Sequence, residues 1–163
     1  DIMPFIRSYF NAIPSLLNTE NLKMWEHFGN GGAWNKPHET GWFLAQTRFM
    51  LLMERGNELW LAPYVTTHWM KNGMSVGIED GPTRFGKVSY TVTSHVSEGY
   101  IEAVIDPPTR SMPDSLVLRL RHPEGKSIKS VTVGGKAHAD LDPVKECIRL
   151  APCSDRLTVR AQY

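Results

Sequence analysis

The sequence predicts an α+β protein in which amino-terminal helices are followed by an antiparallel β-sandwich. Up to about residue 53, apolar residues recur at helical spacing, whereas after Trp60 they alternate with polar residues as in half-buried strands. The change falls within residues 35–64, where a helix is followed directly by a strand over residues 58–63. We therefore expect a helical segment over residues 1–56 and a β-domain over residues 57–163.

Two helical elements are predicted before residue 30. Asp1 is a candidate cap for the first, and Pro14 should kink or end it. One face of this helix carries five apolar residues, which are Ile6, Tyr9, Phe10, Ile13 and Leu17. A second, short helix is expected to begin at Thr19 and to turn Leu22 and Trp25 inward.

The longest helix is predicted to have its apolar part over residues 42–53, where apolar side chains cover more than one stripe. Asn35 is the candidate N-cap, Glu39 lies in the first turn, and Gly56 is expected just past the carboxyl end. Gly41 within this helix costs roughly 1 kcal/mol relative to alanine. That cost indicates a close contact or a ligand at its level.

Short strands separated by turn residues follow, as is typical of an antiparallel sandwich. A hairpin is expected from strands near residues 88–92 and 101–105, and Gly134-Gly135 suits a tight two-residue turn. The strand over residues 116–120 is expected to carry Arg119 on its outer face, and strands near residues 148–150 and 157–161 close the fold. Residues 81–86 are expected to form a loop.

Composition excludes several classes of partner. The 18 Lys and Arg residues nearly balance the 17 Asp and Glu residues, and no basic run is present, which argues against nucleic acid. No apolar stretch approaches the roughly 20 residues of a membrane-spanning helix, which argues against a membrane partner. Cys147 and Cys153 lack zinc-site spacing, so neither a metal nor a cofactor is expected; the two thiols either pair or stay free.

The loop between the helices concentrates the side chains best suited to bind a ligand. Around three glycines within residues 25–39 it gathers Trp25, Glu26, His27, Trp34, His38 and Glu39. An indole face covers the C–H side of a sugar ring while carboxylates accept its hydroxyls, so this pattern favours a carbohydrate site. The alternative is that the tryptophans fill a hydrophobic core, that the histidines lie on the surface, and that Glu39 is in the first turn only because its negative charge interacts favourably with the helix dipole.

Several stretches resemble the carboxyl-terminal region of bacterial six-hairpin glycoside hydrolases. They are ELWLAPYV at residues 58–65, GPTRFGKVSYTV at 81–92, RHPEG at 121–125, SVTVGGK at 130–136 and LDP at 141–143. In that family an (α/α)6 catalytic barrel is followed by a small β-sandwich. The resemblance implies that residues 1–56 are the last helices of the barrel and that residues 57–163 are the appended sandwich. It also implies a secreted or periplasmic location.

The same resemblance suggests catalytic residues. Residues 24–28 are similar to the Trp-Glu-Arg-Trp element of α-L-rhamnosidase-like barrels, whose glutamate activates water, although His27 and Phe28 stand where that family has Arg and Trp. Glu26 is then the candidate base, and Glu39 is the alternative candidate for the same role. An inverting glycosidase holds two carboxylates about 6.5 to 9.5 Å apart. The general acid is expected on an earlier helix, so this chain alone should be inactive; the other reading is that Glu26 and Glu39 form the pair.

The sequence leaves two further functions open. In one, the β-domain is a carbohydrate-binding module whose sugar platform uses Trp60, Trp69, Tyr90 or Tyr100, unless these aromatic residues point into the core. In the other, the domain is purely structural or binds another protein. If the glycosidase reading holds, the partners are carbohydrate and the remainder of the barrel, and the exposed apolar helices should make the chain self-associate.

Overall fold

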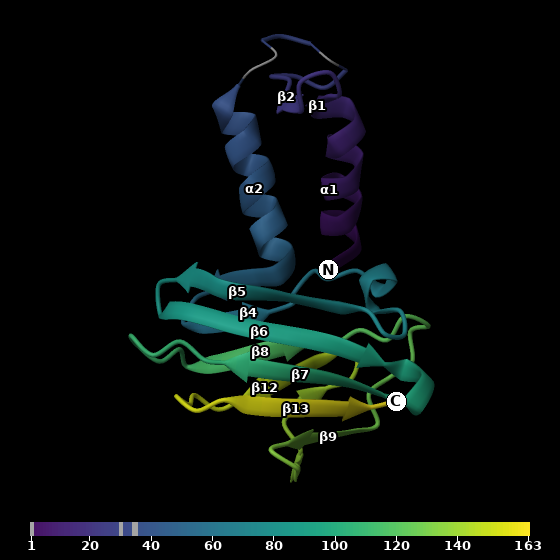
Figure 1. Ribbon diagram of the computed structural model, residues 1–163, viewed down its shortest axis with the longest axis vertical. Helices are drawn as coiled ribbons and strands as arrows, with labels where there is room; N and C mark the ends of the chain where they lie inside the picture. Colours follow the sequence, from purple (N-terminus) through teal and green to yellow (C-terminus); the bar gives the residue numbers. More distant parts are fainter. Residues whose placement is uncertain (1, 30, 34–35) are drawn as a thin grey trace. The chain divides into compact units, whose positions relative to one another are not determined.

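The computed structural model describes residues 2–29, 31–33 and 36–163 (Figure 1). The chain divides into two compact units, residues 1–50 and residues 51–163, which we call the helical unit and the β unit. The predicted caps Asp1 and Asn35, and the candidate sugar-binding residue Trp34, lie outside the described residues. Over the described residues the protein is α+β, with two α-helices and mostly antiparallel sheets.

The helical unit contains α1 (Ile2–Leu16), β1 (Leu17–Asn18), β2 (Lys23–Met24) and α2 (Pro37–Leu51), whose last residue begins the β unit. Tyr9 joins the two helices, because its ring stacks on Phe43 with centroids 5.4 Å apart and its hydroxyl lies 2.9 Å from Thr47 Oγ1. Pro14 lies within the last turn of α1, so the helix ends two residues beyond it. The predicted first helix is therefore confirmed, except that Leu17, expected on its apolar face, lies in β1.

The short helix predicted from Thr19 is wrong. β1 and β2 form an antiparallel pair there, with Leu17 opposite Met24, and residues 19–22 turn between them. The Oδ1 atoms of Asn18 and Asn21 accept hydrogen bonds from the backbone two residues later, at 3.0 and 3.1 Å. Such local side-chain bonds compete with a helix. Leu22, expected to point inward, has a positive φ of 57° and is 77% exposed.

The predicted end of the long helix is also wrong. α2 ends at Leu51, and the next residues form β3 (Leu52–Arg55), which pairs with β4 (Glu58–Leu61). Gly56, expected to follow the helix, instead has a φ of 56° in the two-residue turn of this hairpin. The strand is favoured because it buries Leu52 beside Leu61 while its backbone pairs with β4.

In the β unit, the five-stranded sheet has the order β11-β12-β8-β4-β3. Its further strands are β8 (Ser115–Arg119), β11 (Leu141–Asp142) and β12 (Cys147–Leu150). The pairing of β4 with β8 is parallel, which the expectation of a wholly antiparallel fold did not include. Arg119 points outward as predicted from the strand's alternation, but its side chain is only 16% exposed because it pairs with Glu146 at 3.3 Å.

The six-stranded sheet has the order β10-β9-β13-β7-β6-β5. Its strands are β5 (Ser75–Thr83), β6 (Gly86–His95), β7 (Tyr100–Asp106), β9 (Ser130–Val133), β10 (Lys136–His138) and β13 (Leu157–Gln162). The β6–β7 hairpin is confirmed, and so is the tight turn at Gly134-Gly135, where φ is 56° and 78°. The loop expected over residues 81–86 is wrong, since β5 runs to Thr83 past an irregularity at Asp80 and only residues 84–85 turn.

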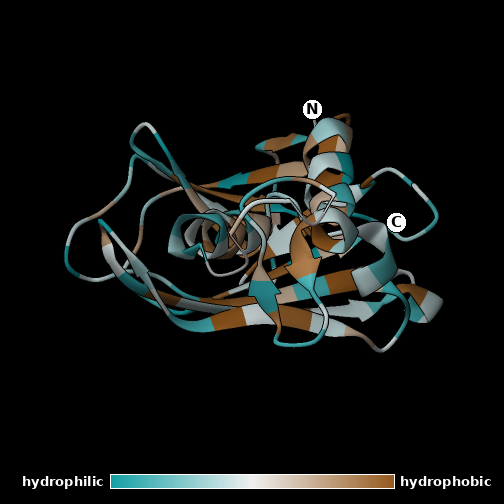
Figure 2. Ribbon diagram, turned by 90° about the horizontal axis from the view of Figure 1, so that it is seen from above, coloured by the Kyte–Doolittle hydropathy of each residue, from teal (hydrophilic) through white to brown (hydrophobic). Residues whose placement is uncertain are grey.

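Both sheets contribute to one hydrophobic core. Every second residue of β6 and β7 is buried, as the alternation of hydropathy along the strands in Figure 2 illustrates. The largest fully buried side chains of the two sheets include Leu59, Leu61, Ile101, Ile105, Leu116, Leu118 and Ile148. Two 3₁₀ turns, η1 (Thr67–Met70) and η2 (Val96–Glu98), complete the unit. This arrangement is compatible with the expected sandwich.

Candidate functional site

Backbone hydrogen bonds close the loop that follows β2. The Trp25 amide donates to Leu16 at 2.7 Å, and the Glu26 amide donates to Ala33 at 3.0 Å. His27 and Gly31 form an isolated antiparallel bridge between these points. Gly32 has a φ of 80°, and a Cβ atom there would lie 2.9 Å from Cβ of Glu26, so only glycine suits this position. The loop therefore has a defined backbone around Glu26.

Glu26 is held as a carboxylate by this loop. Its Oε1 atom lies 3.0 Å from Lys36 Nζ, and its Oε2 atom accepts a 3.3 Å hydrogen bond from the Ala33 amide. The hydrogen bond from Lys36 is the main cause that lowers the pKa of Glu26, with the Ala33 amide second. Glu26 is thus ionised at neutral pH, which suits a base or a charge stabiliser and not a general acid.

Glu39 lies in a pocket of about 220 Å³ between α1 and α2. Trp42 and Phe43 of α2 line the same pocket, together with Phe28 from the loop. Within α2 the carboxylate also pairs with its neighbour, since His38 Nε2 lies 2.9 Å from Glu39 Oε1. The pocket therefore combines aromatic side chains with a carboxylate that is 24% exposed.

Among the described residues, Trp25 and Glu39 line different cavities. Trp25 lines a different hollow, of about 600 Å³, beside the β1–β2 turn. The His27 side chain lies against Gly32, and His38 is 53% exposed at the start of α2. Of the five candidates that lie among the described residues, Glu39 is the one that lines the pocket between the helices, and Glu26 faces Lys36.

Sequence reasoning missed the other residues of the Glu39 pocket, although their spacing carries a signal. From α2 the pocket takes Glu39, Trp42, Phe43 and Gln46, which are the positions i, i+3, i+4 and i+7 of one helix face. From α1 it takes Ser8, Ala12 and Leu16, which are four residues apart. A search for small residues on one helix facing aromatic residues and a carboxylate on the other could have identified it.

The helical unit also exposes large apolar side chains. On α2, Trp42 is 63% exposed and Leu44 is 62% exposed. On α1, Phe10 is 43% exposed. Trp42 and Leu44 are two residues apart, so they lie on opposite sides of α2. The helical unit therefore exposes large apolar side chains on more than one face.

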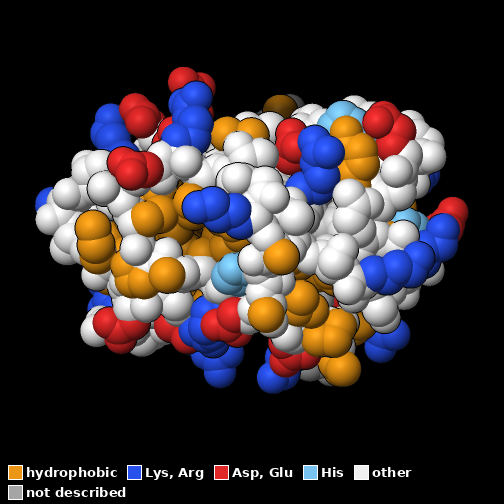
Figure 3. Space-filling view, turned by 90° about the horizontal axis from the view of Figure 1, so that it is seen from below, with side chains coloured by type: hydrophobic (Ala, Val, Ile, Leu, Met, Phe, Trp, Pro, Cys, Tyr) orange, Lys and Arg blue, Asp and Glu red, His pale blue; other side chains and the backbone are white. Residues whose placement is uncertain are grey.

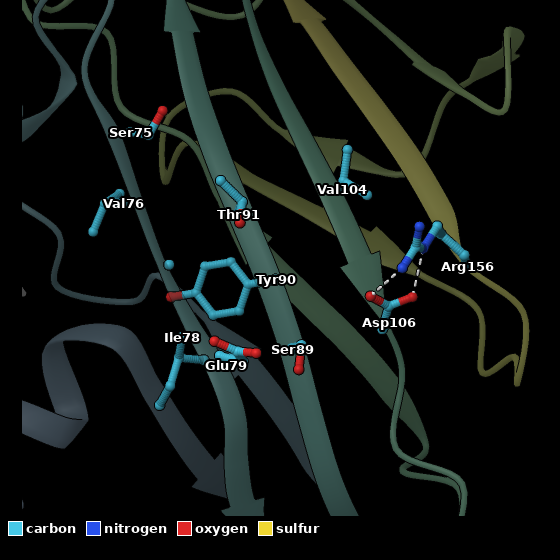
Figure 4. Close-up of a pocket in the computed structure, with 11 residues that line it drawn as sticks. Ser75, Val76, Ile78, Glu79, Ser89, Tyr90, Thr91, Val104, Asp106 and Arg156 are labelled. Atoms are coloured by element: carbon cyan, nitrogen blue, oxygen red, sulfur yellow. Dashed lines mark hydrogen bonds and ion pairs between the residues drawn. The ribbon is translucent and has the colours of Figure 1, made fainter.

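In the β unit, a hollow of about 550 Å³ lies on the outer face of the six-stranded sheet (Figure 4). Ser89 and Thr91 of β6 border it, and Arg156 holds Asp106 with two hydrogen bonds of 2.6 and 2.9 Å. Its one aromatic residue, Tyr90, is 3% exposed and belongs to the core. This hollow lacks an aromatic surface on which a sugar could stack.

Among the described residues, neither the charged side chains nor the two cysteines form a further candidate site. Basic and acidic side chains are interspersed on the face drawn in Figure 3. Cys147 and Cys153 are free thiols, and burial raises the pKa of each. Within the described ranges, no group of three or more His, Cys, Asp or Glu side chains could hold a metal ion.

Among residues 2–29, 31–33 and 36–163, the helices are too short or too polar to cross a membrane. No known family model and no curated protein sequence matches the chain.

Proposed function

We propose that this chain is the carboxyl-terminal part of a six-hairpin glycoside hydrolase, resembling the α-L-rhamnosidases. In this proposal the helical unit supplies part of the sugar-binding cleft, and the β unit is a sandwich that braces an (α/α)6 barrel. The observation that carries the proposal is the pocket in which Glu39 lies beside Trp42 and Phe43. The same resemblance favours a secreted or periplasmic protein.

The composition of the Glu39 pocket suits a sugar ring. Aromatic side chains present apolar faces to C–H groups, while Glu39 and Gln46 offer hydrogen-bonding atoms to hydroxyls. Its volume of about 220 Å³ is smaller than the roughly 300–1,000 Å³ of pockets that hold drug-sized ligands. Such a pocket suits one sugar ring, with the remainder of the substrate bound by other parts of the barrel.

Glu26 has the ionisation state that the proposed chemistry requires. In an inverting glycosidase, one carboxylate activates water while a second carboxyl group protonates the leaving oxygen. Lys36 and the Ala33 amide hold Glu26 in its ionised form, which fits the first role. The general acid would come from a helix that precedes this chain in the barrel. Without that helix the present chain should not hydrolyse glycosides.

The exposed side chains of the two helices support the barrel assignment. In an α/α barrel each hairpin packs against its neighbours on both sides, so a hairpin taken alone presents apolar side chains to water. Trp42, Leu44 and Phe10 are exposed in this way. The hairpin is therefore suited to neighbours of the same kind.

The test is hydrolysis of a panel of aryl glycosides by the protein encoded by the complete reading frame. We expect activity that Glu26→Gln lowers by at least about a hundredfold in kcat, the scale of lost acid–base catalysis. Glu39→Gln should mainly raise KM. Glu98→Gln, on the exposed η2 turn of the β unit, is the matched control and should leave both constants unchanged. Absence of glycosidase activity, or equal activity of all three variants, would refute the proposal.

A further inference from the structure

A second surface with the chemistry of a sugar site lies on the outer face of the five-stranded sheet. This groove, of about 670 Å³, is bordered by the β3–β4 turn, by β8 and by the β11–β12 hairpin. Trp60 lies in it, and we call it the Trp60 groove. All its lining residues belong to the β unit, so it is distinct from the pocket that contains Glu39.

The position of Trp60 follows from the alternation of β4. Its neighbours Leu59 and Leu61 are fully buried in the core, so Trp60 points to the opposite face of the sheet. Across the sheet it pairs with Met53 on one side and with Val117 on the other. The ring is therefore an apolar surface at the outer face, and for Trp60 the alternative that the aromatic residues point into the core is wrong.

Hydrogen bonds fix the orientation of the indole. Trp60 Nε1 donates to Glu58 Oε2 at 2.9 Å, and the other oxygen of Glu58 pairs with Arg149. Arg149 Nη1 also donates to Ser115 Oγ at 2.7 Å, and the guanidinium of Arg55 lies 5.7 Å from the Trp60 ring centroid. The Arg149 contact is the main cause that lowers the pKa of Glu58. A ring held in this way loses little conformational entropy when a ligand stacks on it.

The charges of the groove cancel. Its carboxylates are Glu58, Asp140 and Asp142, and its cations are Arg55, Lys145 and Arg149. Equal numbers of both signs give a charged ligand no net attraction. The same side chains offer both donors and acceptors, which a neutral polyhydroxyl compound can use together.

Part of this hydrogen-bonding capacity is still available to a ligand. Asp142 is occupied, because it accepts two backbone hydrogen bonds and pairs with Lys145 Nζ at 3.1 Å. The carboxylate of Asp140 lies exposed at the groove and makes no hydrogen bond or ion pair with another residue in the described part of the chain. Asp140 is therefore the acceptor best placed to bind a hydroxyl group of a ligand on Trp60.

We propose that the Trp60 groove binds a neutral oligosaccharide, with the indole covering the C–H face of one sugar ring and with Asp140 and Arg55 bonding its hydroxyls. The site goes beyond the proposed function, because a sandwich that only braces a barrel needs no ligand. It would hold a carbohydrate chain on the β unit independently of the chemistry in the helical unit.

The test is a ¹H–¹⁵N NMR titration of the intact chain with neutral gluco-, xylo-, manno-, galacto- and rhamno-oligosaccharides and with a uronate oligosaccharide. We expect at least one neutral oligosaccharide to bind saturably with a Kd below about 10 mM and to shift the indole N–H signal of Trp60. Absence of binding across the panel, or binding of the uronate oligosaccharide alone, would overturn the proposal.

Variants identify the site. Asp140→Asn should weaken binding about tenfold, the effect of one lost charged hydrogen bond, without disturbing the fold. Glu79→Gln, an exposed carboxylate at the hollow of the six-stranded sheet, is the matched control and should change nothing. Trp60→Ala should abolish binding. If the alanine variant does not fold, Trp60→Phe replaces it in the test; this variant keeps an aromatic ring and should bind more weakly than the parent.

A further variant separates this site from the one in the helical unit. Glu39→Gln should leave oligosaccharide binding by the Trp60 groove unchanged. If Glu39→Gln abolishes binding while Asp140→Asn does not, the groove is not the site and the proposal fails, whereas the proposed function is supported. If Asp140→Asn weakens binding and the complete protein proves inactive on glycosides, the groove stands and the hydrolase proposal fails.

Discussion

The hydroxyl of Tyr90 donates a 2.6 Å hydrogen bond to the carbonyl oxygen of Leu51 and accepts one of 3.1 Å from the Ala62 amide. Tyr90 is in β6 of the six-stranded sheet, whereas Leu51 and Ala62 flank the β3–β4 hairpin of the five-stranded sheet. The phenol of Tyr90 therefore joins the two sheets of the β unit next to Leu51, the first residue of that unit. Burial raises the pKa of Tyr90, so the hydroxyl keeps its proton.

Tyr90→Phe should lower the free energy of unfolding by about 0.5–1.5 kcal/mol, because the change removes a buried hydrogen bond while the Ala62 amide still donates to the Leu51 carbonyl at 2.8 Å. Urea unfolding followed by circular dichroism measures this. Tyr100→Phe is the control, since the Tyr100 ring lies on the outer face against His95 and Arg160 and should matter less. Equal stabilities of Tyr90→Phe and the parent protein would show that the bond does not contribute.

Gly41 tests whether the helical unit normally has a neighbour. Gly41 lies within α2, away from the helix ends, and is exposed to solvent. A Cβ atom at this position would have no atom within 4 Å. The close contact expected from the sequence is therefore absent from the described residues. Gly41→Ala should stabilise this chain by up to about 1 kcal/mol through helix propensity.

The same substitution should behave differently in the complete protein. If a barrel helix or a sugar approaches Gly41 there, the added methyl group should cancel the gain in stability or reduce activity. Thermal unfolding of both proteins gives the comparison. Equal stabilisation of both, with activity unchanged, would indicate that nothing approaches Gly41.

His122 should make stability depend on pH. Its side chain is 2% exposed, and its Nδ1 atom accepts a 3.1 Å hydrogen bond from the Glu124 amide, which requires that atom to be unprotonated. Burial is the main cause that lowers the pKa of His122 from 6.5, with Lys126 second and Glu124 acting in the opposite direction. The folded state therefore favours neutral imidazole.

Because the unfolded chain takes up this proton first, stability should be highest above pH 6.5 and fall between pH 6.5 and the lower pKa of the folded state. Urea unfolding at a series of pH values measures the slope. His122→Asn keeps an acceptor but cannot titrate, so its slope should be smaller. His68→Asn, at an exposed histidine, should retain the slope of the parent. Identical slopes for both variants would exclude His122 as the cause.

Gly77 should tolerate no side chain. A Cβ atom there would lie 2.1 Å from the carbonyl oxygen of Tyr90 in the neighbouring strand, which is a backbone atom and can move only with β6. We expect Gly77→Ala to lower the free energy of unfolding by about 1–3 kcal/mol. Ser75→Ala, on the same exposed strand, should change it by less than about 0.5 kcal/mol. Similar values for the two variants would contradict the close approach.

The β unit was the more predictable half because a strict alternation marks its central strands. Val88, Tyr90 and Val92 all point into one core, and a shift of one residue would expose all three. The β3 strand was missed because an apolar run that continues a helix carries no signal of where the helix stops. The parallel pairing of β4 with β8 was missed because it joins distant parts of the chain.

The sequence predicted which residue types the candidate site contains, but not how their side chains are arranged. The carboxylates, aromatic residues and glycines of the loop were recognised, but the pairing of Glu26 with Lys36 depends on how the loop closes through Ala33. The assignment of Glu39 to an aromatic pocket depends on the packing of α1 against α2, which local spacing does not determine. Trp60 illustrates the same limit, since alternation predicts two faces and not which of them is covered.

We propose that the helical unit is part of a larger helical domain whose other helices cover its apolar side chains. The most direct test is sedimentation velocity of the 163-residue chain, with parallel measurement of dye binding to apolar surface. We predict concentration-dependent self-association and dye binding, both reduced by the double variant Trp42→Glu, Leu44→Glu at exposed positions of α2. A monomer at all concentrations that binds no dye would contradict the claim.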